Sequence, residues 1–230
     1  MSEEILDIFT RDGKLIGAKP RSECHVKNPG FYHRPSWIWI YNSNGEILVQ
    51  KRAMAKKNWP GYYDMPAAGH VESGESPLEG AIREAKEEIG LDLRPEDLTF
   101  AFEYIYDSSW ELGQVYFVKC DKKAEEFKLQ EKEVELVKWL SFDDFKKLLY
   151  SDAWVPYAAD YKALIVKELK KILTNELWPV VLSSPLLCRF LSLVPHRHVF
   201  MAINCGKYIH RQQNRQTLYY VFTKHRRVLP

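Results

Sequence analysis

The chain has 230 residues, of which 46% are hydrophobic and 28% charged, and its formal net charge is +2. This composition is typical of an ordinary soluble globular protein with enough apolar residues for a core. The four cysteines are scattered without a C-x-x-C pair, which argues against a zinc site or a disulfide framework. The acidic N-terminus lacks the apolar segment of a secretory signal, so we expect a cytoplasmic protein.

Charge is distributed unevenly along the chain. Residues 1–173 carry 25 basic and 30 acidic side chains, whereas residues 174–230 carry eight basic side chains and one acidic one. We therefore predict a domain at 1–173 and a basic, irregular extension at 174–230, whose folding the sequence leaves open. Contact of this extension with nucleic acid or anionic lipid is the alternative interpretation. Its apolar stretch 177–194 contains two prolines and an arginine and barely reaches spanning length, so we expect no membrane segment.

The predicted elements begin with two hairpins. Alternating apolar residues flank Asp12-Gly13 within residues 4–21, and a similar pattern flanks Asn44-Gly45 within residues 36–52. Three short segments rich in β-forming residues then predict strands at 98–106, 114–120 and 134–140.

Helices are predicted in two places after the strands. Ser141 suits the N-cap of a helix that covers SFDDFKKLLYS, and apolar residues recur at helical spacing over residues 157–173. Together with a third helix in residues 69–91, these elements predict an α+β domain with a mixed β-sheet.

Residues 69–91, GHVESGESPLEGAIREAKEEIGL, combine a well-specified helix with clustered acids. Ser76-Pro77-Leu78-Glu79 is a capping box with proline at the first helical position, and Gly90 suits the left-handed position after the helix. Glu84, Glu87 and Glu88 share a narrow arc opposite the apolar face, where like charges repel. A hard divalent cation with oxygen ligands would offset this repulsion, and a solvated charged face is the alternative.

The full stretch resembles the Nudix box, G-x5-E-x7-R-E-U-x-E-E-x-G-U, in which U is an aliphatic residue. Only Ala85 is smaller than usual; the matching positions are Gly69, Glu75, Arg83, Glu84, Ala85, Glu87, Glu88, Gly90 and Leu91. A spaced pattern with this many fixed positions is far more specific than an isolated glycine loop. The resemblance implies the Nudix fold, an α/β/α sandwich in which the box forms a loop and a helix beside a mixed β-sheet.

The resemblance also implies a reaction. Nudix enzymes hydrolyse a diphosphate linked to another group, with Mg²⁺ or Mn²⁺ held by the box glutamates. It therefore implies that the metal is held by Glu84, Glu87, Glu88 and the Gly69 carbonyl, with Glu84 and Glu87 as catalytic residues. It further implies that Glu75 pairs with Arg83 to orient the loop and helix without touching the metal.

The residues before the box, KRAMAKKNWPGYYDMPAAGH, resemble isopentenyl-diphosphate isomerase and its hydrolase-like relatives. The isomerase has a catalytic cysteine where this chain has Ala68, and the isomerase box is degraded where this one is complete. We therefore predict a hydrolase on an isomerase-like scaffold. The resemblance implies that Arg52 and Lys56 face the diphosphate and that His70 binds substrate, with surface cations and a structural hydrogen bond as the alternatives.

The isomerase's metal histidines have counterparts available in His25, His33 and His70. A complete glutamate box needs no histidine ligand, so we interpret His25 and His33 as ordinary polar residues. Only Glu111 stands near the isomerase's second acidic pair.

Many Nudix enzymes take a general base from a loop before a late strand. The segment LQEKEVELVKW offers three glutamates, of which we choose Glu133, and a plain charged loop is the alternative. Trp59, Trp110 and Trp154 could stack on an organic group at the pocket mouth or could belong to the core.

We therefore predict a pyrophosphohydrolase that uses Mg²⁺ or Mn²⁺ and acts on a nucleoside diphosphate derivative or another small organic diphosphate. An isopentenyl-diphosphate isomerase-like activity and a non-catalytic Nudix-fold binding module are the alternatives. We expect a small-molecule partner, no specific nucleic acid and no membrane, and a homodimer stays open.

Overall fold

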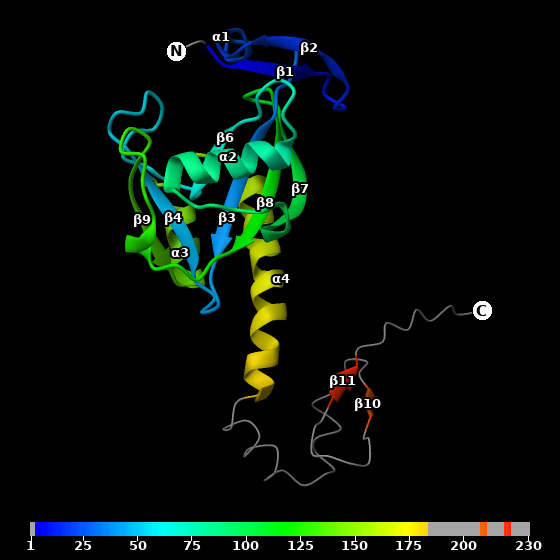
Figure 1. The fold of residues 1–230 in the computed structure, drawn as a ribbon, viewed down its shortest axis with the longest axis vertical. Helices are drawn as coiled ribbons and strands as arrows, with labels where there is room; N and C mark the ends of the chain where they lie inside the picture. The colour runs from blue at the N-terminus through cyan, green and yellow to red at the C-terminus, as the bar shows by residue number, and fades with distance from the viewer. Residues whose placement is uncertain (1–2, 184–207, 211–218, 222–230) are drawn as a thin grey trace, which may run out of the picture. The chain divides into compact units, whose positions relative to one another are not determined.

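The computed structural model describes residues 3–183, 208–210 and 219–221 (Figure 1). The chain divides into two compact units, Met1–Glu176 and Leu177–Pro230. In the second unit, β10 (Tyr208–His210) and β11 (Tyr219–Val221) pair in antiparallel fashion. Most of the apolar stretch 177–194 lies outside the described residues, and no described helix is both long and apolar enough to cross a membrane.

The first unit begins with a hairpin and a short helix and continues into a sheet interrupted by helices. Its elements are β1 (Ile5–Phe9), β2 (Leu15–Pro20), α1 (Arg21–Cys24), β3 (Pro35–Tyr41), β4 (Ile47–Arg52), β5 (Tyr63–Asp64), β6 (Ala67–His70), α2 (Pro77–Ile89), β7 (Leu98–Tyr106), β8 (Glu111–Lys119), β9 (Val134–Leu140), α3 (Phe142–Leu149) and the part of α4 (Ala159–Ser183) up to Glu176, with 3-10 turns at Pro95–Asp97 and Ala124–Glu126.

Seven strands of this unit form one mixed sheet in the order β5-β4-β3-β8-β7, with β6 beside β3 and β9 beside β4. Strands β3 and β8 run parallel, and the other pairs are antiparallel. The predicted hairpin at 36–52 forms, but β3 and β4 pair only at Tyr41 and Ile47 before they diverge. This divergence lets β6, the strand that carries Gly69, pair with β3.

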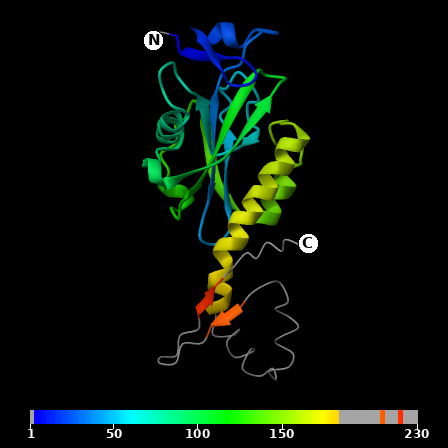
Figure 2. The same cartoon turned by 90° about the vertical axis from the view of Figure 1, so that its right-hand side faces the viewer.

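Helices cover both faces of the sheet, which confirms the predicted α/β/α sandwich (Figure 2). Side chains alternate across β3, so Trp37 and Trp39 pack in the cluster with α3 and α4, whereas Ile38 and Ile40 pack in the cluster with α2. The predicted strands and helices are present, and α4 continues past Leu173 to Ser183.

Helix α2 begins and ends as its sequence predicts. The Ser76 hydroxyl accepts a hydrogen bond from the Glu79 backbone and the Glu79 carboxylate accepts one from Ser76, so the capping box is complete. Gly90 follows the helix in the left-handed region at φ 64°. The two caps fix where α2 lies along the chain and therefore which residues face the sheet.

The N-terminal hairpin rests on the loop that precedes α2. Leu6 bridges to Glu72, the Ser73 backbone donates to the Ile5 carbonyl at 2.7 Å, and the Ser73 hydroxyl donates to Asp7 at 2.6 Å. The hairpin and α1 therefore lie beside the box loop, where they supply part of the wall of the site.

Candidate active site

The three glutamates predicted to face a metal lie on α2, but they differ in exposure. The Glu84 side chain is 14% exposed and that of Glu87 is 54% exposed, whereas Glu88 is buried. The backbone N–H of Ala68 donates to the Glu88 carboxylate at 3.1 Å, which ties the end of the helix to β6. All three line one cavity of about 740 Å³.

Gly69 lies directly against the Glu84 carboxylate. A Cβ at this position would lie 1.9 Å from Cδ and 2.1 Å from Oε1 of Glu84. An added Cβ would push the Glu84 carboxylate aside, so glycine lets this carboxylate lie directly against β6. We call this place, where β6 meets the Glu84 carboxylate of α2, the cradle.

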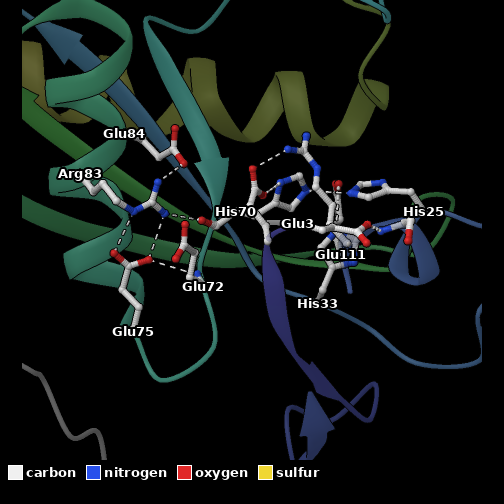
Figure 3. A network of polar contacts seen from close by, with 12 residues as sticks. Glu3, His25, His33, His70, Glu72, Glu75, Arg83, Glu84 and Glu111 are labelled. Atoms are coloured by element: carbon white, nitrogen blue, oxygen red, sulfur yellow. Dashed lines mark hydrogen bonds and ion pairs between the residues drawn. The ribbon is translucent and has the colours of Figure 1, made fainter. Parts of the chain in front are cut away.

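Arg83 organises the loop and the helix around this cradle (Figure 3). Its guanidinium donates to both oxygens of Glu75 at 3.1 and 3.0 Å and to the His70 carbonyl at 2.7 Å. It also donates to Glu84 at 2.6 Å and lies 3.7 Å from Glu87. The predicted contact between Glu75 and Arg83 is present, and one cation also orients the Glu84 carboxylate.

Burial makes ionisation of the carboxyl groups at the cradle less favourable. It raises the pKa of Glu88 to about 8, and the neighbouring Glu84 carboxylate adds to the increase. Burial also raises the pKa of Glu84. Ionised carboxylates placed this close and out of water are stabilised by a bound cation, because its charge favours the deprotonated form.

Two predicted phosphate-binding residues line the cavity but already have partners. Arg52 donates to the buried Asp64 carboxylate at 2.9 Å and to the Asn58 carbonyl at 3.2 Å. Lys56 forms an ion pair with Glu133, the predicted general base, and all of these residues line the cavity. Burial lowers the pKa of Lys56, and the positive charge of Arg52 lowers it further.

A second group of possible ligands includes two histidines that line the same cavity, His25 and His70. His25, His33 and His70, which come from three separate segments, place their ligand nitrogens within 4.8 Å of one another, close enough to hold a metal ion. The ring nitrogens of His25 and His70 are 3.0 Å apart, and Nε2 of His33 lies 3.7 Å from Glu111 (Figure 3). The spacing of these histidines in the sequence did not predict this convergence.

The environment of the histidine group favours neutral rings. His33 is fully buried, and neither of its ring nitrogens has a hydrogen-bond partner among the described residues. Burial, together with the smaller effect of the neighbouring His25, lowers the pKa of His33 to about 3. Burial also raises the pKa of Glu111 to about 7. Neutral imidazoles that are not already hydrogen-bonded are able to ligate a metal.

Several charged cavity residues were not predicted from the sequence. Glu4 and Arg21 arrive from the N-terminal hairpin and α1, and Asp64 arrives from β5. Burial lowers the pKa of His25, and the nearby Arg21 charge lowers it further. The contact between the hairpin and the box loop brings Glu4 and Arg21 here, whereas the pairing of β5 with β4 brings Asp64.

The family of the chain follows from a sequence comparison that agrees with this site. The NUDIX domain description matches residues 31–159, more than half of the chain, and the chain belongs to the Nudix family. Nudix hydrolase 3 of Arabidopsis thaliana is 35% identical over 175 residues, which cover 68% of this chain and 22% of that protein. A Nudix hydrolase of Clostridium acetobutylicum is 33% identical over 158 residues, which cover 65% of this chain and 75% of the relative.

Within this family the chain is an enzyme of the Nudix pyrophosphohydrolase type. The predicted isomerase-like subgroup agrees with an isopentenyl-diphosphate Delta-isomerase of Salmonella heidelberg, which is 26% identical over 67% of this chain and 86% of that protein. The solved structure of a Deinococcus radiodurans protein superposes with a TM-score of 0.59 at 19% identity, covering 72% of this chain and 99% of that one. This likeness confirms the fold.

The residues of the cradle fit the divalent cation that the family uses. Glu84, Glu87 and Glu88 offer carboxylate oxygens at the cavity, and hard cations such as Mg²⁺ prefer oxygen ligands. The space that a Cβ on Gly69 would fill is held open beside Glu84.

Proposed function

We propose that this protein is a divalent-metal-dependent hydrolase that cleaves the diphosphate linkage of a nucleoside diphosphate derivative or another small organic diphosphate. The observation that carries the proposal is the convergence of Glu84, Glu87 and Glu88 with the glycine cradle in a cavity that also contains basic side chains. The Gly69 carbonyl and these three carboxylates would hold Mg²⁺ or Mn²⁺. When bound, the cation supplies charge neutralisation at the diphosphate and Lewis acidity toward phosphorus and water.

The protein's own residues bind the phosphates and move a proton. We assign Arg21, Arg52 and Lys56 to the phosphate oxygens, because all three line the cavity with the glutamates. His70 closes the wall beside the cradle. Arg83 and Glu75 hold Glu84 in position rather than bind substrate.

Glu133 is our proposed general base. As water attacks phosphorus, this carboxylate accepts the water proton, the bond from phosphorus to the bridging oxygen breaks, and the leaving phosphate takes the electron pair. The ion pair with Lys56 holds Glu133 at the cavity. Glu84 and Glu87 complete the catalytic set as metal ligands.

A substrate panel tests this proposal. The full-length protein is incubated with nucleoside diphosphate sugars, dinucleotides and alkyl diphosphates in the presence of Mg²⁺ or Mn²⁺, and products are identified by mass spectrometry. Release of a monophosphate or phosphate from at least one substrate is expected. Absence of turnover throughout the panel at neutral and alkaline pH would rule the proposal out.

An isomerase-like activity is the second candidate, because His25, His70 and Glu111 line the same cavity and His33 is close to all three. Ala68 lines that cavity without a thiol, so one of the two groups needed for protonation chemistry is missing. Deuterium exchange from solvent into isopentenyl diphosphate separates the candidates, since a hydrolase introduces none. A non-catalytic binding module would instead bind nucleotide without metal-dependent turnover.

The proposal extends to the organisation of the chain. We place the hydrolase in residues 1–173 and treat residues 174–230 as an extension that catalysis does not need, so truncation after Leu173 should leave kcat and KM unchanged. We further propose a cytoplasmic location, a small-molecule substrate and no specific nucleic acid, and leave a homodimer open. Loss of activity on truncation would move the boundary.

A further inference from the structure

Of the three tryptophans that could stack on an organic group, the structure places one at the cavity. Trp154 is 1% exposed and stacks on Trp39 in the core, and Trp110 packs against Tyr32 in a separate small cluster. Trp59 is 44% exposed and lines the cavity together with the phosphate-binding candidates and the box glutamates. An exposed indole at the wall of a polar cavity has no core-packing explanation.

The backbone at Trp59 is also unusual. Its φ is +52°, in the left-handed region that bulky residues seldom adopt, and it precedes Pro60, whose ring favours an extended conformation at the residue before it. Such a conformation costs free energy and persists only where surrounding contacts enforce it, commonly at ligand-binding sites. The turn therefore places the indole at the cavity although this backbone conformation is strained.

Several contacts hold this turn against the phosphate end of the cavity. Arg52 donates from Nε and Nη2 to the Asn58 carbonyl at 3.3 and 3.2 Å, and its own carbonyl accepts from Gly61 at 3.1 Å. Lys56, on the same loop, is anchored to Glu133. Trp59 itself makes an edge contact with Tyr62, with ring centroids 5.3 Å apart. The loop thus couples the indole to residues assigned to the diphosphate.

The other aromatic residues of the cavity wall already pack against one another. Trp37 and Tyr106 both lie 6.4 Å from Tyr157, measured between ring centroids, so these rings pack on one another. Among the described residues that line the cavity, Trp59 presents a large exposed aromatic surface. Nucleobases stack on such a surface whatever their hydrogen-bonding pattern, because every base has a π face.

We propose that Trp59 is a specificity-determining residue that stacks on the planar base of the substrate. The inference rests on the proposed function and sharpens its substrate class: a nucleoside diphosphate derivative is preferred over an alkyl diphosphate. The diphosphate lies toward the arginine and lysine side chains of the loop, and the base lies against the indole.

Binding of two matched probes tests the proposal without requiring turnover. ADP and inorganic pyrophosphate both carry two linked phosphates, but only ADP carries a base. Their dissociation constants are measured by calorimetry with Mg²⁺ on the full-length wild type, Trp59→Leu and Trp59→Phe. Phe100→Leu serves as the matched control, because Phe100 is an exposed aromatic residue outside the cavity lining.

Trp59→Leu is expected to weaken ADP binding about tenfold, equivalent to about 1.4 kcal/mol, and to leave pyrophosphate binding within about twofold. Trp59→Phe should recover part of the loss, and Phe100→Leu should change neither constant. An equal effect on both probes, or no effect on ADP, would overturn the role of Trp59. If hydrolysis fails but the selective loss of ADP affinity is seen, the stacking inference stands and the proposed reaction falls.

Discussion

Replacement of Gly69 by alanine is expected to disturb the geometry of the site much more than the stability of the fold. The added Cβ would lie 1.9 Å from Cδ of Glu84, so the carboxylate must rotate away from its present position. Its 2.6 Å hydrogen bond from Arg83 would then be lost or weakened. The substitution therefore changes the position of the two carboxylate oxygens of Glu84.

The effect on stability should be small. Loss of a hydrogen bond to a charged group costs about 1.5–3 kcal/mol, and replacing glycine by alanine returns about 0.4–1 kcal/mol through the unfolded state. The net loss is then about 1 kcal/mol, which lowers Tm by about 2–4 °C for a domain of this size. The effect on catalysis should be much larger, because a displacement of about 1 Å can reduce a rate about 100-fold.

Gly113→Ala is the matched control for this reasoning. Its Cβ would lie 2.3 Å from the ring of Trp37, a rigid and buried side chain that cannot turn aside as a carboxylate can. Overpacking of this kind costs about 1–3 kcal/mol, so Tm should fall further than in Gly69→Ala. Thermal unfolding and Mg²⁺-dependent turnover are measured on both variants. Wild-type kcat and Mg²⁺ half-saturation in Gly69→Ala would refute the proposed cradle.

Three further predictions concern charge and metal. Asp64→Asn leaves the partly buried Arg52 guanidinium without its counter-charge and should reduce the free energy of unfolding by about 3 kcal/mol in urea titrations, whereas an unchanged midpoint would contradict the pairing. Hydrogen bonds from Arg11 and Tyr32 lower the pKa of Asp107 to about 2, below its unfolded value of about 3.9, so the stability that it contributes is present above about pH 4 and is lost as pH falls toward 2. The difference in urea stability between wild type and Asp107→Asn should therefore shrink between pH 6 and pH 2, and a constant difference would argue against the linkage. Chelation with EDTA should abolish turnover and added Mg²⁺ should restore it, and activity that survives complete chelation would exclude the metal-dependent reaction.

Local signals predicted most of the fold. The capping box at Ser76 and the left-handed Gly90 lie next to the residues they act on, so they can be identified without tertiary information. Strands β5 and β6 were not predicted, because two and four residues are too short to show a period. Their positions depend on the divergence of β3 from β4.

Helical geometry predicted the part of the site that one segment carries, whereas the residues expected from other segments rested on family resemblance. The box supplies Glu84, Glu87 and Glu88 from a single helix, and helical geometry alone places them together. The histidine group and the Lys56–Glu133 ion pair join segments far apart in the chain, so only the folded structure brings their members into contact. The same holds for Arg21, which reaches the cavity because the N-terminal hairpin rests on the box loop.

The most direct test of the central claim compares two identical substitutions on one helix. Glu87 lines the cavity, whereas Glu79 caps the start of α2, where glutamine also completes a capping box. Rates of diphosphate hydrolysis are measured across a Mg²⁺ titration for wild type, Glu87→Gln and Glu79→Gln. The account predicts that Glu87→Gln loses at least about 100-fold in kcat, the scale of removing a group that stabilises the transition state, while Glu79→Gln stays within about twofold of wild type. Comparable activity in Glu87→Gln and wild type would contradict the assignment of the box glutamates to metal-dependent hydrolysis.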